Sequence, residues 1–155
     1  MTRTEILTAI KPYFTIDELV CDHVLAKWKE GAWNFLDTDY LHALLVIRRD
    51  ILKLPMWCNT STRHQRGLRC NRCQMVRSKN TPYLSAHLLG KGGDFNIVGM
   101  SAAVAREKIK ANAALLPCQV RIEAFDENGN PPSWLHFDVR PDDSKPDMKV
   151  VEFHA

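Results

Sequence analysis

Apolar residues recur at helical spacing in three parts of the chain. The first part covers residues 14–29, where Thr15 and Glu18 have the spacing of a capping box ahead of the apolar positions. The second covers residues 38–52, and the third follows Ser101 and ends at about residue 116. The pattern therefore predicts three amphipathic helices.

Alternating apolar and polar positions predict strands in the second half of the chain. Residues 118–125 and 134–139 both alternate in this way, and the segment between them is rich in Asp, Asn, Gly and Pro. We therefore expect these two strands to form an antiparallel hairpin. Shorter strands are predicted over residues 56–60 and 94–98, and the polar, basic segment 61–82 is predicted to be a long surface loop.

Three helices and a hairpin within 155 residues indicate one α+β domain over residues 1–155, with a small antiparallel sheet flanked by helices. The composition, 45% hydrophobic and 25% charged, is that of a globular chain with its own core. We expect this core to span residues 13–140. Residues 141–155 are predicted to form a tail or an edge strand.

Charge and hydropathy exclude several classes of partner. No run of about 20 apolar residues is present, so no membrane partner is expected. The short apolar stretch at the start contains Thr4, Glu5 and Thr8 and does not fit a signal peptide, so we expect cytoplasmic synthesis. A net charge of +3 is too small to predict binding to nucleic acid, and we expect a monomer without a nucleic-acid partner.

The residues best suited to carry chemistry are His87, Asp94 and His136. His87 and Asp94 flank a glycine-rich bend, and His136 lies on the second strand of the predicted hairpin. Two imidazoles and one carboxylate are ligands that zinc accepts, and three protein ligands leave a fourth position for water. Glycines at 90, 92 and 93 would permit positive φ and close backbone approach. Taken singly, each residue also has a simpler interpretation: a hydrogen-bonded histidine, a turn carboxylate or a solvent-facing histidine.

Together these residues form a longer motif that resembles the zinc D-alanyl-D-alanine carboxypeptidase family, in Ser85, His87, Gly90, Gly92, Asp94, Trp134 and His136. That family includes vancomycin-resistance dipeptidases and phage endolysin peptidases. The resemblance implies the fold of hedgehog and DD-peptidase domains. It also implies one catalytic zinc ion bound by the two histidines and the aspartate, and a peptidoglycan stem peptide as substrate.

The resemblance extends to an arginine upstream of the zinc motif. The family carries a Gly-aromatic-Arg element whose arginine binds substrate and stabilises the oxyanion, and Gly67-Leu68-Arg69 lies at the matching place. This implies the same role for Arg69, with Arg66 as the alternative. Otherwise both are solvated charges of a basic loop.

The catalytic base departs from the family pattern. Family members place a Glu or His shortly before the last zinc histidine, but residues 130–133 here contain neither. Both hairpin registers that we consider leave Glu123 on the same face as His136, so Glu123 is the predicted base. An ordinary ion pair with a neighbouring arginine is the alternative. Asp138, on that face, and Ser85 of the motif are expected to contact the zinc ligands and orient them without binding the metal.

Five cysteines are an odd number, which favours free thiols over a disulfide framework. Cys70 and Cys73 have the spacing of half a zinc ribbon or of a redox pair, and Cys58 with His64 could complete a second, structural zinc site. We expect instead that free or locally paired thiols brace the loop.

The predicted function is that of a zinc metallopeptidase, an enzyme that cleaves peptidoglycan stem peptides by metal-activated water. It would act as a D-alanyl-D-alanine carboxypeptidase or as an endolysin-type endopeptidase that reaches the cell wall after phage-type lysis. The alternative is a non-catalytic, zinc-containing module of the same fold that binds an anionic partner through the basic loop 63–79.

Overall fold

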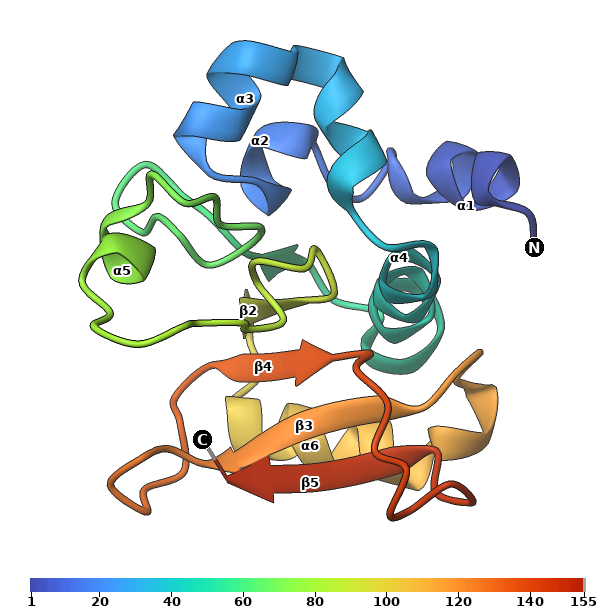
Figure 1. Cartoon of the computed structure of the whole chain (residues 1–155). Coiled ribbons are helices and arrows are strands. Elements are labelled where there is room, and N and C mark those ends of the chain that lie inside the picture. The colour runs from blue at the N-terminus through green and yellow to red at the C-terminus, as the bar shows by residue number, and fades with distance from the viewer. Residues whose placement is uncertain (155) are drawn as a thin grey trace.

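The computed structural model describes residues 1–154 and shows an α+β fold with an open five-stranded sheet (Figure 1). The strands, in the spatial order β1-β2-β4-β3-β5, are β1 Met56–Trp57, β2 Gly92–Ile97, β4 Leu135–Asp138, β3 Val120–Phe125 and β5 Val150–His154. All neighbours are antiparallel except β3 and β5, which are parallel. The sheet is therefore mixed, and the predicted purely antiparallel sheet is wrong.

The predicted hairpin is confirmed. Arg121 pairs with Asp138 and Ile122 with Phe137, so that the same register sets Glu123 opposite His136. On the other side of β4, Asp94 of β2 pairs with His136. Three adjacent strands thus present polar side chains on one face at the same level.

The helical segments, in chain order, are α1 Arg3–Ile10, α2 Ile16–Leu19, α3 Asp22–Trp28, η1 Lys29–Phe35, α4 Thr38–Val46, η2 Ile47–Leu52, α5 Gln74–Arg77, α6 Ala102–Ala111 and η3 Ala113–Leu115. In Figure 1, α6 lies behind β3 and α4 beside the sheet, while α2 and α3 lie farther from it. The second and third predicted helices are confirmed, each with a short irregular turn at its carboxyl end. None of the helices within residues 1–154 has the length and apolar character needed to span a bilayer.

The first predicted helix is broken into α2 and α3. Glu18 accepts a hydrogen bond from the backbone N–H of Thr15 at 2.9 Å, as the capping box requires. At Val20 the backbone turns extended and forms a parallel bridge to Leu68, and Cys21 N donates to Leu68 O at 2.9 Å. Pairing with a distant loop therefore overrides the local helical pattern.

One buried cluster connects the helices to the sheet. Phe95 and Phe137 stack at 5.4 Å between ring centroids, and Tyr40 of α4 packs on Phe137 at 5.6 Å. The cluster also contains Ile6 of α1 and Val150 of β5. The core thus extends beyond residues 13–140 on both sides, because α1 packs on α4 and the last strand joins the sheet.

Only one glycine of the bend before β2 needs the left-handed region. Gly90 has φ +65°, and a Cβ there would overlap the carbonyl of Phe35. Gly92 and Gly93 lie within β2 without positive φ, which corrects the expectation for them. At Gly92 close packing is the requirement, because a Cβ would lie 2.7 Å from Asp138 Cβ.

Replacing Gly90 by alanine should lower the free energy of unfolding by about 3 kcal/mol, since the positive φ and the overlap with Phe35 both oppose a Cβ. Urea denaturation measures the change. Gly31→Ala is the matched control, because nothing lies within 4 Å of a Cβ there, and it should change stability by less than about 1 kcal/mol. Equal midpoints for the two variants would contradict this account.

Candidate metal centre

The structure brings His87, Asp94 and His136 together at the polar face of the sheet. Asp94 on β2 and His136 on β4 are register partners, and His136 Nδ1 lies 2.6 Å from Asp94 Oδ1. His87 reaches the same carboxylate from the loop before β2, with Nε2 3.5 Å from Asp94 Oδ1. The predicted set of three is thus one cluster.

His87 is held in one orientation by the basic loop. Its Nδ1 donates to the carbonyl of Gly67 at 2.9 Å, which leaves Nε2 with its lone pair toward Asp94. The backbone N–H of Arg69 donates to the carbonyl of His87 at 3.1 Å, so the two loops are fastened together. A histidine fixed through one ring nitrogen is preorganised to offer the other to a metal.

The three donor atoms fit a metal ion. All lie within 4.8 Å of one another. A tetrahedral zinc site with bonds of about 2.0–2.1 Å to N and O has ligand-to-ligand edges of about 3.3 Å. The 3.5 Å between His87 and Asp94 is close to this edge, and the 2.6 Å between His136 and Asp94 would have to open by under about 1 Å. These two edges therefore need shifts of under about 1 Å to accept a zinc ion, and the third edge is no longer than 4.8 Å.

The pKa values of the two histidines shift in opposite directions. Burial would lower the pKa of His136, but Asp138 and Asp94 outweigh it and raise that pKa to about 9. Burial lowers the pKa of His87. Burial also opposes ionisation of Asp94, yet its hydrogen bonds with His136 and His87 bring its pKa below the ordinary value. His136 therefore carries a proton at neutral pH in the metal-free protein, and a metal ion must displace it.

Asp138 lies behind His136, as predicted. Its carboxylate is fully buried and lies 3.6 Å from His136 Nε2. Arg121 donates two hydrogen bonds to it, both 3.0 Å, and the Arg140 side chain adds one at 3.1 Å. Two arginines thus fix the carboxylate that faces the ring of His136.

Arg69 also lies at this centre. Its side chain is 6% exposed, donates to Gln65 O and Tyr83 Oη, and has one terminal nitrogen 3.6 Å from Asp94 Oδ2. It is therefore a positioned group of the cluster and not a solvated loop charge.

Glu123 is 8% exposed on the face that carries His136. Burial raises its pKa above the ordinary value. Within residues 1–154 its carboxylate forms no hydrogen bond or ion pair, whereas the nearby Arg121 is engaged by Asp138. The alternative of a surface ion pair with Arg121 or Arg140 therefore does not occur.

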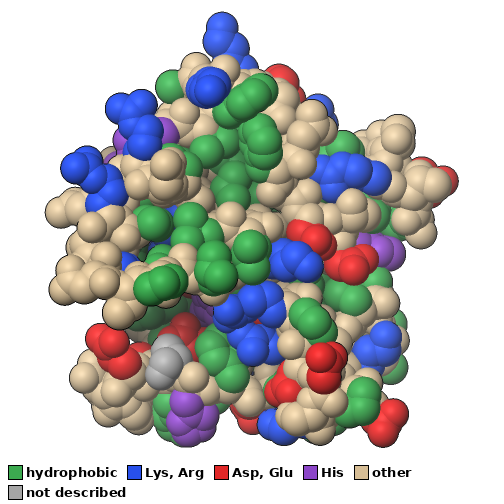
Figure 2. Space-filling view, viewed as in Figure 1, with side chains coloured by type: hydrophobic (Ala, Val, Ile, Leu, Met, Phe, Trp, Pro, Cys, Tyr) green, Lys and Arg blue, Asp and Glu red, His purple; other side chains and the backbone are tan. Residues whose placement is uncertain are grey.

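The three candidate ligands, Arg69 and Glu123 line one cleft of about 360 Å³. Its walls also contain Ser85, Tyr83, Trp134 and Phe153. The face in Figure 2 is hollowed below the loop that carries α5, and acidic and histidine side chains show in the hollow. Ser85 lies at the wall with its Oγ buried and without a hydrogen-bond partner among the described residues. Of the two expectations for residues 141–155, a tail or an edge strand, the edge strand is confirmed as β5, but the sequence pattern did not indicate that Phe153 lines the cleft.

Cys70 and Cys73 do not lie beside Cys58 and His64, the partners considered from the sequence. Cys58 is fully buried in the core and His64 lies 3.8 Å from Asp22, so neither joins Cys70 and Cys73. Cys21 and His23, at the start of α3, take these places. The Cys-x-His spacing was the only sequence signal for them.

Comparisons of the chain with protein-family models, curated proteins and solved structures gave no match.

The structure predicts that wild-type protein binds one more metal ion than His87→Ala, because the variant loses an imidazole with Nε2 toward Asp94. Metal content after zinc reconstitution and gel filtration, measured by mass spectrometry, gives the difference. His64→Ala is the control, since that side chain is outside both ligand clusters. Identical metal content in wild type and His87→Ala would rule out the centre.

Proposed function

We propose that the chain is a zinc metallopeptidase whose active site is the cleft at the polar face of β2, β4 and β3. The observation that carries the proposal is the cluster of His87, Asp94 and His136 at a cleft that also contains the unpaired carboxylate of Glu123. Three protein ligands leave a coordination position open, which is the arrangement of a catalytic zinc site. The motif resemblance is what favours a hedgehog or DD-peptidase fold.

Zinc in this cluster would polarise the scissile carbonyl and make a water molecule acidic enough to attack it. Glu123 is the base that takes the proton from the attacking water and passes it to the leaving amine. Its raised pKa suits a group that must both accept and release a proton. Among residues 1–154 no lysine or arginine forms an ion pair with its carboxylate, which leaves the carboxylate free for this exchange.

Arginines at the cleft suit a peptide carboxylate or a developing oxyanion. Arg69 is held by Gln65 O and Tyr83 Oη, so its remaining terminal nitrogen has a defined direction near Asp94. Arg140 also lines the cleft. A guanidinium fixed in this way stabilises negative charge without reorganisation during the reaction.

Peptidoglycan stem peptides are the substrate class that we favour. The support is the motif in residues 85–94 and 134–136 together with the cleft arginines, which fit the terminal carboxylate of a D-alanyl-D-alanine peptide. A carboxypeptidase and an endopeptidase would use the same zinc ligands and the same base. The released product distinguishes them.

The alternative, an anion-binding module that uses residues 63–79, gains little from the structure. Arg63 and Arg66 both donate to Asn96 Oδ1, and Arg69 is buried at the centre. Half of the six basic side chains in this loop are thus used within the fold. Those that remain are Arg72, Arg77 and Lys79.

Glu123→Gln should retain zinc but lower peptidoglycan hydrolysis by about 10²–10⁴-fold, because the amide cannot accept the proton of water. Release of D-alanine and of stem-peptide fragments from purified peptidoglycan, followed by chromatography, measures the loss. Glu127→Gln, in the exposed β3–β4 loop, should retain full activity. The enzyme proposal fails if zinc-loaded wild type releases neither product.

Arg69→Lys should lower kcat/KM by about 10²-fold while zinc content is retained, because lysine keeps the charge but loses the fixed guanidinium fork. Steady-state hydrolysis of a D-alanyl-D-alanine peptide measures this. Arg77→Lys, an exposed position at the end of α5, is the matched control. Wild-type kinetics in Arg69→Lys would remove Arg69 from the site.

A further inference from the structure

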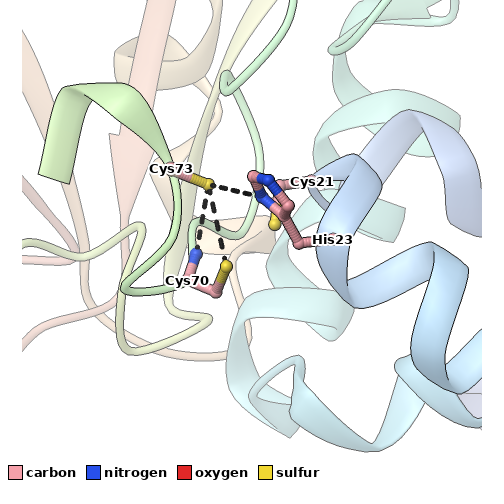
Figure 3. A group of neighbouring side chains, drawn as sticks. All are labelled: Cys21, His23, Cys70 and Cys73. Carbon is pink, nitrogen blue, oxygen red and sulfur yellow. Dashed lines mark hydrogen bonds between the residues drawn. The ribbon is translucent and has the colours of Figure 1, made fainter. Parts of the chain in front are cut away.

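A second group of metal-ligating side chains lies outside the cleft, between α3 and the basic loop. Cys21 and His23 come from the start of α3, and Cys70 and Cys73 from the turn before α5 (Figure 3). The four donor atoms lie within 4.8 Å of one another. Two pairs of residues that are 47 or more positions apart in sequence thus direct three sulfur atoms and one imidazole nitrogen at one point.

The distances match those of a tetrahedral zinc site. With bonds of about 2.3 Å to sulfur and 2.0–2.1 Å to nitrogen, the edges are about 3.8 Å for two sulfurs and about 3.6 Å for sulfur and nitrogen. Here Cys70 Sγ lies 4.0 Å from Cys73 Sγ, which lies 3.9 Å from His23 Nδ1. These two edges therefore need shifts of only a few tenths of an ångström to accept the ion, and the other edges are no longer than 4.8 Å.

The backbone around the cysteines favours thiolates. The N–H of Cys70 donates to Cys73 Sγ and the N–H of Arg72 to Cys70 Sγ, both at 3.4 Å. Hydrogen bonds of this kind stabilise negative sulfur and orient the ligands. Cys73 N also donates to Cys70 O at 3.1 Å, which closes the turn that brings the two sulfurs to one side.

We propose that Cys21, His23, Cys70 and Cys73 bind one structural zinc ion that fastens the basic loop to α3. Four protein ligands fill the tetrahedral shell, so the site has no open position for chemistry. Three thiolates and one imidazole select zinc over magnesium or calcium, which take oxygen ligands. A redox pair would need only Cys70 and Cys73, and would leave Cys21 and His23 without a reason to converge on them.

The ion would hold the segment that orients the cleft. Leu68 lies two residues before Cys70, and its N–H and carbonyl pair with Leu19 O and Cys21 N at 2.8 and 2.9 Å. Gly67 on one side of it fixes His87, and Arg69 on the other lies beside Asp94. The effect on the cleft rests on the proposed function, but binding of the ion does not.

Cobalt(II) reconstitution of the full chain under reducing conditions separates the two sites. Thiolate-to-cobalt charge transfer gives near-ultraviolet absorption that a centre of two histidines and one aspartate lacks. Wild type should bind two equivalents and show this absorption. Cys73→Ser should lose the absorption and one equivalent, whereas His87→Ala should lose the other equivalent and keep the absorption.

Two further variants make the test decisive. Cys118→Ser, at a cysteine outside both clusters, should behave as wild type. His23→Cys keeps four ligands and adds a thiolate, so it should fold, bind two equivalents and absorb more strongly. Folded wild type without the charge-transfer absorption, or Cys73→Ser that retains it, would overturn the structural zinc site. If wild type instead binds a single equivalent that shows the charge-transfer absorption and is retained in His87→Ala, the structural zinc site stands and the peptidase centre fails.

Discussion

The alternation of side chains along β2, β4 and β3 is the constraint on which the candidate site depends. Phe95, Phe137 and Ile122 point into the core, and the residues directly before or after them point to the opposite face. A register that sets His136 between Asp94 and Glu123 therefore places the proposed metal ligand on one side of His136 and the proposed base on the other. A slip of one residue would bury these charges under the helices and expose the phenylalanines.

The buried charge of Asp138 on this face is tolerated because it has fixed partners. Asp138 is fully buried, but Arg121 and Arg140 supply four hydrogen bonds to it, three from side chains and one from the Arg140 backbone. A buried carboxylate without such partners would instead become protonated. Within residues 1–154 Glu123 has no partner of this kind, and burial raises its pKa. The same sheet face thus holds one carboxylate charged and leaves the other able to exchange a proton.

Local patterns were enough to predict the hairpin, the helices over 38–52 and 101–116, and the shared face of Glu123 and His136. Each depends on periodicity within a few residues of one segment. The break between α2 and α3, the parallel strand β5 and the meeting of Cys21 and His23 with Cys70 and Cys73 depend on pairing between distant segments. Periodicity within one segment does not indicate which distant segments pair. Cys58 and His64 were therefore considered as partners of Cys70 and Cys73, whereas Cys21 and His23, which lie beside them, were missed.

The two ligand clusters differ in chemistry, and the short segment 67–70 connects them. At one end of this segment the Gly67 carbonyl fixes an imidazole of the open, oxygen- and nitrogen-containing centre. At the other end Cys70 belongs to the closed, sulfur-rich cluster. Between residues 52 and 92 the chain forms only a two-residue strand and one short helix, so hydrogen bonds of regular structure do little to hold it. The proposed tetrahedral ion would fix this loop where regular secondary structure is sparse.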